Sequence, residues 1–496
     1  MHNKVQNQNT NGLFYLMLAS CIIALVMLHS NELWTMESRW STVCWLMLRN
    51  HDYLHPYLFN GLYFDKPLLS YWFIIGFAKL FGHLNELALR LPSAIAGITS
   101  IYCVYRLSKT LFNAKIGIIT GWLLITSYFF VFWMRTASAD MLNIAGILLG
   151  LTWYFEHKKS RHFFDYFIFF LIISLTSLCK GLSGFAIPML GVVIDIILCN
   201  TWRQHLNWKN LSAFVIAILI YLSSFVAAEL TTNSHEIQHS GIYEVFHENI
   251  LRYLSPFDHQ DAWYTYFIYL PIYLLPWTIL LFFAVKSHVK QWKLLQYSQR
   301  WLFIFIITIF IFFSLSGSRR SYYILPIIPF IALFMAEWIY HYFEQNTYAQ
   351  KQKYKTIIKN SIILLYLLLF CFFAFVQPIM NNLSFGAQQL ADKVNQEISK
   401  IPNIENRNIL LLNSKDNSLV FYLRIPKAVT VTTVDITTLN TIIKQSLQTK
   451  MFPIIILQKQ DLSELEKKEI LKNVNYKTIL PPESSTKDNA VLIPIM

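Results

Sequence analysis

Isolated cations and carboxylates stand between the apolar runs of this chain. The segment GLYFDKPLLSYWF (61–73) places Asp65 and Lys66 directly before one such run, and Asp140 comes directly before another. A cation in this position could hold a phosphate through charge-assisted hydrogen bonds and stabilise charge that develops on a leaving group. A carboxylate could deprotonate an acceptor hydroxyl. These residue types suit group transfer from a lipid phosphate.

Long apolar runs must position these residues. Hydrophobic residues make up 55% of the 496 residues and charged residues 14%, whereas soluble domains have about 25% charged residues. The bulky sequence HSNELWTMESRW follows the first run, so we expect a retained helix and not a cleaved signal peptide. Twelve runs lie near 13–30, 67–82, 89–107, 114–133, 141–156, 163–180, 183–199, 211–229, 263–285, 301–317, 322–343 and 360–378.

Other function classes find little support in the composition. The formal net charge of +13 could indicate nucleic acid as a partner, but no compact basic fold is evident, so we expect none. The six cysteines include no CxxC pair, which argues against both a zinc site and a disulfide framework.

The distribution of basic residues predicts the topology, because Lys and Arg concentrate in cytoplasmic loops. If all twelve runs crossed the membrane from an inside N-terminus, five basic clusters would lie outside. If 67–82 does not cross, all five lie inside with Lys4, and eleven spans result. We therefore expect 67–82 to be a helix at the outer interface, with Lys66 at its start. The clusters are 106–115, 158–161, 203–209, 286–300 and 351–359.

The same topology identifies the ionisable residues of the outer loops. The basic ones are Arg39, Arg49, Lys66, Arg90, Arg135, Lys180, Arg252, Arg319 and Arg320. The acidic ones are Glu37, Asp65, Asp140, Glu248, Asp258 and Asp261. Simpler roles compete: Arg49 and Arg90 suit interfacial anchors, and Asp140 suits a helix N-cap equally well. Asp195 lies near the cytoplasmic end of its run, so we interpret it as a locally paired polar residue.

The last part of the chain has a different character. Residues 380–496 read as a small soluble α/β domain facing the periplasm, after a membrane domain over 1–379. Four segments predict strands: NRNILLLNS, SLVFYLR, AVTVTTV and FPIIILQ. The segment DLSELEKKEILKNV predicts a helix with Asp461 or Ser463 as its N-cap. No catalytic motif is visible in this region.

Several blocks in order resemble a known family. MESRWSTVCWLMLRNHDYLHPYLFNGLYFDKPLLSYW followed by LRLPSAIAG resembles the first outer loop of lipid-carrier-dependent glycosyltransferases with the GT-C fold. That family includes the aminoarabinose transferase of lipid A and is related to protein O-mannosyltransferases. RTASADMLN, CKGLSGFAIP and SLSGSRRSYYILPIIP resemble later blocks, so the resemblance covers residue 13 to about 345.

The resemblance implies a GT-C-like bundle of about 11–13 transmembrane helices, with interfacial periplasmic helices and the small α/β domain. It implies transfer of a sugar from undecaprenyl phosphate in the bacterial inner membrane, with lipid A, another envelope glycan or a protein as acceptor. The implied phosphate-binding residues are Lys66, Arg252, Lys180 and Arg319. The implied catalytic carboxylates are Asp140 and Glu37, and the implied substrate-binding residues are Arg39, Tyr63, Asp65 and Tyr323.

Two departures from the family pattern bear on mechanism. Met36 stands where the family has its first-loop Asp, so either Glu37 takes over or the reaction relies on Asp140 and the phosphate-binding cations. Some relatives have Glu and His where this chain has Asp65 and Asn249, and His247 and His259 lack metal-ligand spacing. No cofactor is specified, and a divalent metal ion is left open.

Two other readings remain. A transporter or flippase of a lipid-linked substrate would be equally polytopic, but such proteins often show internal repeats and acids at the midplane. Here the charges gather in outer loops and no repeat is visible. A catalytically silent relative, which Met36 would explain, is the second alternative.

Overall fold

The computed structural model of the chain forms two compact units. It describes residues 2–495 except 60, 161, 232–242, 244–246, 248–259, 346, 384–385, 402–406, 413–417, 424, 426–428, 468–469, 473 and 482–488. The first unit comprises Met1–Leu28, Phe64–Gly76 and Arg90–Ala374. The second comprises His29–Tyr63, Phe77–Leu89 and Phe375–Met496.

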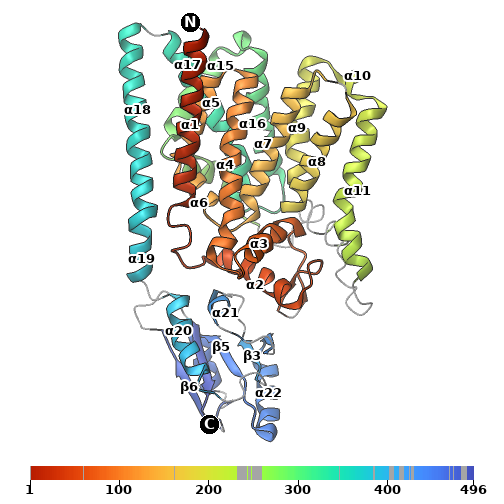
Figure 1. The fold of residues 1–496 in the computed structure, drawn as a ribbon, viewed down its shortest axis with the longest axis vertical. Helices are drawn as coiled ribbons and strands as arrows, with labels where there is room; N and C mark the ends of the chain where they lie inside the picture. Colours follow the sequence, from red (N-terminus) through yellow and green to blue (C-terminus); the bar gives the residue numbers. More distant parts are fainter. Residues whose placement is uncertain are drawn as a thin grey trace. The chain divides into compact units, whose positions relative to one another are not determined.

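The first unit is a bundle of long helices that lie side by side (Figure 1). Its main helices are α1 (His2–Leu25), α4 (Glu86–Leu111), α5 (Ala114–Ile125), α6 (Tyr128–Met134), α7 (Ala139–His157), α8 (Phe163–Lys180), α9 (Ser183–Cys199), α11 (Trp208–Thr231), α14 (Thr265–Tyr273), α15 (Thr278–Lys290), α16 (Tyr297–Leu315), α17 (Ile328–Gln345) and α18 (Tyr348–Cys371). Shorter turns of helix are α10 (Trp202–His205), η3 (Trp292–Leu294), η4 (Ser321–Ile327) and η5 (Phe372–Val376).

Many of these helices can cross a bilayer. Within the described residues, six helical segments are long and apolar enough to span, or eight if each of two bent pairs is one span. The pairs are α5 with α6, bent by 78°, and α14 with α15, bent by 110°. Together with the shorter or more polar helices α1, α7 and α9, these eight match one for one the eleven runs that the charge distribution treats as spans.

Helix α3 (Leu68–Leu80) forms where 67–82 is predicted not to cross. Its 13 residues extend about 20 Å at 1.5 Å per residue, less than the hydrocarbon core of about 30 Å. The helix alone is therefore too short to span. Its position at the membrane surface stays a prediction.

Small residues bring α7, α8 and α9 into close contact. Gly146 of α7 lies directly against the side chain of Thr176 in α8, where a Cβ atom would collide with it. Gly184 of α9 lies equally close to the backbone at Thr176 and Ser177. In membranes, small residues allow such close approach of helix backbones. The packing fixes the start of α7 and the end of α8 relative to each other, and both ends carry charged residues.

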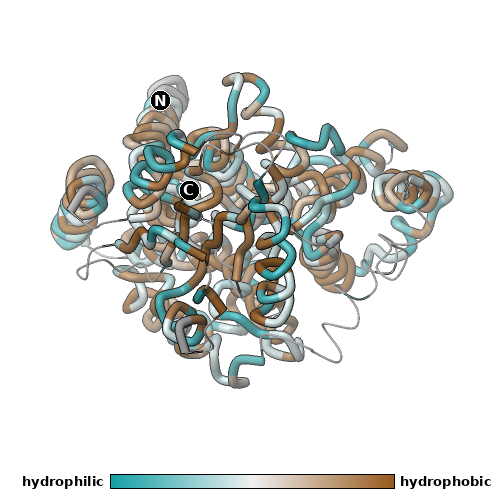
Figure 2. The backbone as a smooth tube through the Cα atoms, turned by 90° about the horizontal axis from the view of Figure 1, so that it is seen from below, coloured by the Kyte–Doolittle hydropathy of each residue, from teal (hydrophilic) through white to brown (hydrophobic). Residues whose placement is uncertain are grey.

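The second unit contains a five-stranded sheet with the order β4-β3-β5-β7-β6. The strands β4 (Val431–Val434), β3 (Ile409–Leu412) and β5 (Ile454–Gln458) are parallel to one another, and β7 (Asn489–Pro494) and β6 (Tyr476–Ile479) complete the sheet with antiparallel pairings. Alternate strand residues enter two separate apolar cores, one on each face. Figure 2 shows hydrophobic strands in brown beside more hydrophilic helical turns in teal.

The predicted α/β character of residues 380–496 is confirmed, with corrections to individual elements. SLVFYLR was expected as a strand but forms the helix α21 (Ser418–Tyr422), because a short apolar run does not distinguish the two by periodicity. Helix α23 (Lys459–Lys467) begins before Asp461, which therefore lies in its first turn and is not its N-cap. The helices α20 (Ala387–Ile398) and α22 (Ile436–Thr449) and the strands β6 and β7 were not predicted.

Helix α22 begins at a well-formed cap. Asp435 is its N-cap and accepts the Thr438 N–H at 2.9 Å and the Thr437 hydroxyl at 2.6 Å. Hydrogen bonds from these two threonines lower the pKa of Asp435 to about 2. The carboxylate is thus kept ionised as the acceptor that a helix N-terminus requires.

The first loop after α1 belongs to the same unit as the C-terminal sheet. It contains α2 (Thr35–Asn50), β1 (Tyr57–Leu58) and β2 (Gly61–Leu62). Trp45 and Phe59 pack against one core of the sheet, and Arg49 donates a 2.6 Å hydrogen bond to the Val429 carbonyl. Burial lowers the pKa of this guanidinium. Contacts therefore group the loop with the tail, and a domain boundary at 379 stays a prediction.

Candidate active site

A buried ion pair joins α7 to α8. Asp140 lies in the first turn of α7, and its carboxylate contacts the ammonium of Lys180 at the end of α8. Ser138, not Asp140, is the N-cap: its hydroxyl accepts the Asp140 N–H at 3.2 Å. The N-cap interpretation of Asp140 is therefore wrong, and its carboxylate pairs with Lys180 instead. Only 6% of the Asp140 side chain and 12% of the Lys180 side chain are exposed.

The turn after α8 determines where Lys180 points. Gly181 has φ of 104°, in a region that residues with a Cβ rarely adopt, and it lets the chain reverse into α9. The Lys180 ammonium lies 5.6 Å from the centre of the Tyr323 ring, within the range of a cation–π interaction. Tyr323, an expected substrate-binding residue, is therefore next to the ion pair.

A second lysine–carboxylate pair precedes α3. The Lys66 ammonium lies 3.0 Å from the Asp65 carboxylate and also 3.0 Å from the Asp65 carbonyl oxygen. Both side chains are partly exposed, at 25% and 20%. Ser70 donates a 2.8 Å hydrogen bond to the carbonyl of Cys179, so the start of α3 is tied to the residue before Lys180. Two predicted phosphate-binding lysines thus belong to segments that are held together.

Tyr322 lies within electrostatic range of the carboxylates of both Asp140 and Asp65. Arg320 lies 3.2 Å from the Tyr322 oxygen, which adds a third cation to this cluster. The sequence placed Arg320 among the outer cations but gave it no role. Its position in the sequence could have indicated this contact, because Arg320 stands two residues before Tyr322 and three before Tyr323.

Arg319 is engaged with the backbone. Its guanidinium donates to the carbonyls of Asp261 at 2.9 Å and Ser316 at 2.7 Å, with a longer bond to Ser314. An isolated β-bridge between Gln260 and Arg319 reinforces the first contact. These contacts give Arg319 a structural role, and its binding of phosphate stays a prediction.

The candidate residues of the first loop lie in the second unit. Glu37 is 2% exposed and accepts the Trp34 N–H at 3.0 Å, as in a capping box at the start of α2. Arg39 donates to the Tyr63 hydroxyl at 2.9 Å and lies 5.9 Å from its ring centre. The contacts described for Glu37 thus serve the helix terminus, and Met36 beside it is half-buried.

Arg252 lies outside the described residues, as do Glu248, Asn249, Asp258 and His259. His247 is described, and its ring stacks on Tyr243 with centres 5.6 Å apart. Among the residues that the structure describes, no group of three or more His, Cys, Asp and Glu side chains could hold a metal ion.

Three other charged residues have structural partners. Arg90 donates to the Leu28 carbonyl at 2.9 Å, and Arg135 donates to the Ile23 and Ala24 carbonyls. Arg135 therefore satisfies carbonyls in the last turn of α1, where a helix leaves acceptors unpaired, and Arg90 satisfies one in the turn that follows. Asp195 pairs with Lys158 at 2.9 Å and accepts the Tyr154 hydroxyl at 2.6 Å, which confirms the prediction of a locally paired residue.

Comparison with known sequences points to transferases. The profile of the family described as dolichyl-phosphate-mannose-protein mannosyltransferase matches residues 65–227. An uncharacterized protein of Aquifex aeolicus is 27% identical over 59% of this chain and 56% of its own length. The undecaprenyl phosphate-alpha-4-amino-4-deoxy-L-arabinose arabinosyl transferase of Pseudomonas paraeruginosa is 26% identical over 64% of this chain and 58% of its own length. The matches thus span a little over half of these relatives.

Comparison with solved structures shows the fold. ArnT from Cupriavidus metallidurans bound to undecaprenyl phosphate aligns with a TM-score of 0.76 at 15% identity, covering 97% of this chain and 98% of that one. The oligosaccharyltransferase AglB from Archaeoglobus fulgidus aligns with a TM-score of 0.55 at 11% identity, covering 97% and 74%. The chain is therefore a multi-pass membrane protein with the GT-C fold, and its predicted resemblance to lipid-carrier-dependent glycosyltransferases is confirmed.

Proposed function

We propose that this protein is a glycosyltransferase that moves a sugar from undecaprenyl phosphate to an acceptor hydroxyl. The observation that carries the proposal is the buried Asp140–Lys180 pair, whose segment is tied to that of the Asp65–Lys66 pair by the Ser70–Cys179 hydrogen bond. It joins a carboxylate that can take a proton with cations that can hold a phosphate, as the reaction requires. The names and folds of the similar proteins support the same class.

The donor phosphate binds to lysine and arginine side chains in this proposal. Lys66 and Lys180 are held near each other through the Ser70–Cys179 hydrogen bond, and Arg320 lies next to Tyr322. Arg252 joins them through the family resemblance alone. Hydrogen bonds from cations to phosphate oxygens are short and strong, and they stabilise the negative charge that grows on the phosphate as the sugar departs.

The acceptor reacts beside Asp140. The acceptor hydroxyl oxygen attacks the anomeric carbon of the sugar, and its proton passes to the Asp140 carboxylate. The bond between the anomeric carbon and the phosphate oxygen breaks, and its electron pair stays on the phosphate. General-base assistance of this kind contributes about 100-fold to 10,000-fold in rate. Glu37, Arg39, Tyr63 and Tyr323 complete the proposed catalytic and substrate-binding set.

The charge distribution supports the proposed orientation, and the family resemblance supports the proposed acceptor. We propose the bacterial inner membrane as the location, with the site and the C-terminal unit facing the periplasm, because the five basic clusters then face the cytoplasm. As acceptor we propose lipid A over another envelope glycan or a protein, on the family resemblance of the sequence blocks alone.

Reconstituted transfer tests this function. Purified protein in lipid nanodiscs receives undecaprenyl-phosphate-linked aminoarabinose and lipid A, and mass spectrometry measures the sugar added to lipid A. We expect multiple turnovers for the wild-type protein and a rate lower by about 100-fold or more for Asp140→Asn. A panel of other lipid-linked sugars and acceptors separates a wrong substrate from a wrong function. Failure to transfer from any donor in the panel, as expected of a transporter or a silent relative, would contradict the proposal.

A further inference from the structure

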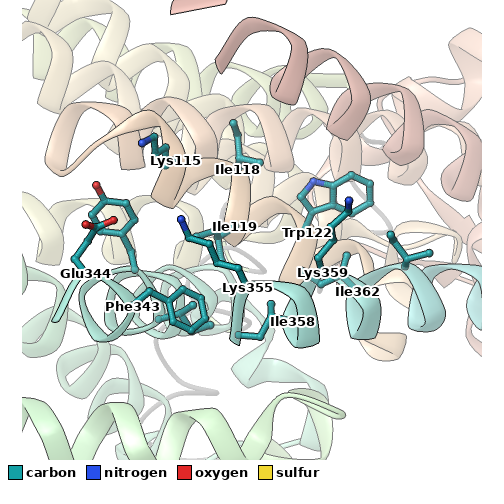
Figure 3. Close-up of a pocket in the computed structure, with 13 residues that line it drawn as sticks. Lys115, Ile118, Ile119, Trp122, Phe343, Glu344, Lys355, Ile358, Lys359 and Ile362 are labelled. Atoms are coloured by element: carbon teal, nitrogen blue, oxygen red, sulfur yellow. The ribbon is translucent and has the colours of Figure 1, made fainter. Parts of the chain in front are cut away.

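An apolar groove of about 470 Å³ lies between α5, α17 and α18. Its walls include Ile118, Ile119 and Trp122 of α5 and Ile362 and Ile363 of α18. Its lining also contains one carboxylate, Glu344, and three lysines from two of the basic clusters, Lys115, Lys355 and Lys359. Figure 3 shows Lys355 and Lys359 extending from α18 toward Ile119 and Trp122 of α5.

The groove exists because α18 contacts the bundle at two separated places. At one, the rings of Phe343 and Tyr354 stack with centres 6.3 Å apart. At the other, the Tyr366 hydroxyl donates to the Ala19 carbonyl at 3.0 Å, and its ring meets Trp122 at 6.0 Å. None of the residues of α18 is fully buried. The stretch between Tyr354 and Tyr366 therefore faces the bundle across unfilled apolar space.

The lining of the groove is net positive. Lys115, Lys355 and Lys359 line it, and within the described part of the chain none of the three forms an ion pair with a carboxylate. The one carboxylate among the lining residues is Glu344, which pairs with Lys351 at 2.6 Å. Glu344 also lies within electrostatic range of Lys355 and Lys115, so the lining holds three lysine charges against one carboxylate.

We propose that this groove binds an anionic phospholipid, with its phosphate at the three lysines and an acyl chain against the isoleucines and Trp122. An apolar wall with several cations in it complements an amphiphile of this charge, and basic pockets between transmembrane helices on the cytoplasmic side bind anionic head groups. The bound lipid fills the space between α18 and α5. The site is formed by residues other than the transfer site, and it does not depend on the proposed reaction.

Quenching of Trp122 fluorescence tests the proposal. The full-length protein is placed in phosphatidylcholine nanodiscs with increasing fractions of phosphatidylglycerol whose acyl chains carry bromine, a contact quencher. The signal of Trp122 is the difference between the wild type and Trp122→Phe. We expect saturable quenching at low fractions of brominated phosphatidylglycerol. Brominated phosphatidylcholine at the same fractions should quench weakly.

Charge-matched variants identify the head-group site. The triple variant K115Q/K355Q/K359Q should need tenfold to a hundredfold more phosphatidylglycerol for the same quenching, since each lysine near an anionic lipid contributes substantially to attraction. The triple variant K286Q/K293Q/K353Q removes the same charge outside the groove and should match the wild type. Equal quenching by the two lipids, no quenching by either, or equal effects of the two triple variants would each overturn the proposal.

Discussion

At the scale of single residues, the start of α7 divides the helix cap and the proposed chemistry between two side chains, Ser138 and Asp140. Because Ser138 caps α7, Asp140→Asn removes only the proton acceptor and the ion pair. We expect transfer to fall by about 100-fold or more, measured as kcat of the purified variant. Ser138→Ala should instead lower stability by about 1 kcal/mol while transfer is largely kept.

A second variant separates the loss of transfer in Asp140→Asn from the loss of stability caused by the unpaired, buried Lys180. Breaking a buried pair by removing one partner costs about 3–5 kcal/mol, so the single variant should unfold at a lower temperature. The double variant D140N/K180Q should regain part of that stability and none of the transfer. Wild-type kcat in Asp140→Asn would show that Asp140 is not the base.

Lys66 gives a second prediction at this scale. Lys66→Ala should lose an interaction of about 1.5–3 kcal/mol with a charged partner, roughly a tenfold to hundredfold loss in affinity for undecaprenyl phosphate. Lys66→Arg should also bind weakly, because a planar guanidinium does not reproduce a compact ammonium. Lys79 lies at the other end of α3, where it stacks on Tyr53. Lys79→Ala should keep full affinity in the same binding titration, and equal losses in both variants would point to damage to α3.

The sequence indicated which residues are candidates for the site but not which side chains they contact. Asp140 and Lys180 were both candidates, but the contact between them depends on the packing of α8 against α7. Arg319 and Arg320 are adjacent in the sequence, but they have different partners. Arg319 donates to a backbone carbonyl and Arg320 to the Tyr322 hydroxyl, and the sequence does not show which arginine does which. Glu37 likewise was expected to be catalytic, yet it also caps α2.

At the scale of elements, the first loop supplies a cap to a helix more than 350 residues later. The carboxylate of Glu32 accepts the N–H groups of Ala387 and Gln388 at 2.8 and 3.0 Å. These amides open α20, where unpaired donors and the helix dipole favour a negative charge. Gly386 lies so close to this carboxylate that a Cβ atom there would collide with it.

Removal of this cap should loosen α20 locally. We expect Glu32→Ala to cost about 0.5–2 kcal/mol and to speed hydrogen exchange at the amides of Ala387 and Gln388. Gly386→Ala should have a similar effect, because it displaces the carboxylate. Glu397 is also on α20, and it pairs with two exposed lysines, Lys400 and Lys477. Glu397→Ala is therefore the control and should change stability little. Unchanged exchange in Glu32→Ala would contradict the role of the cap.

Elements with strong local patterns were predictable, and elements that depend on distant contacts were not. Helices cover all twelve apolar runs, since a bilayer demands long apolar segments. The strands β3, β4 and β5 lie within runs of aliphatic or β-branched residues, and all three were predicted. The strands β6 and β7 were missed: YKTI is short and polar at two positions, and the run that forms β7 gains its burial only by pairing with β5 and β6.

At the scale of the whole molecule, the charge distribution predicts one orientation in the membrane. In a variant lacking the six native cysteines, a cysteine at Lys400 should react with an impermeant reagent from the periplasmic side. Cysteines at Lys209 and Lys353 should react only after the membrane is permeabilised. The reverse labelling pattern would show that 67–82 crosses the membrane or that the N-terminus lies outside.

The contact between Asp140 and Lys180 also has a kinetic consequence. As long as Lys180 holds the carboxylate, an acceptor hydroxyl must compete with an ammonium for Asp140. Arrival of the donor phosphate at Lys180 gives the ammonium another anion, so the acceptor should engage second. We expect steady-state kinetics of an ordered sequence, in which the released carrier phosphate competes with the donor and not with the acceptor. In Lys180→Gln protein, the order should become random even though turnover is slow.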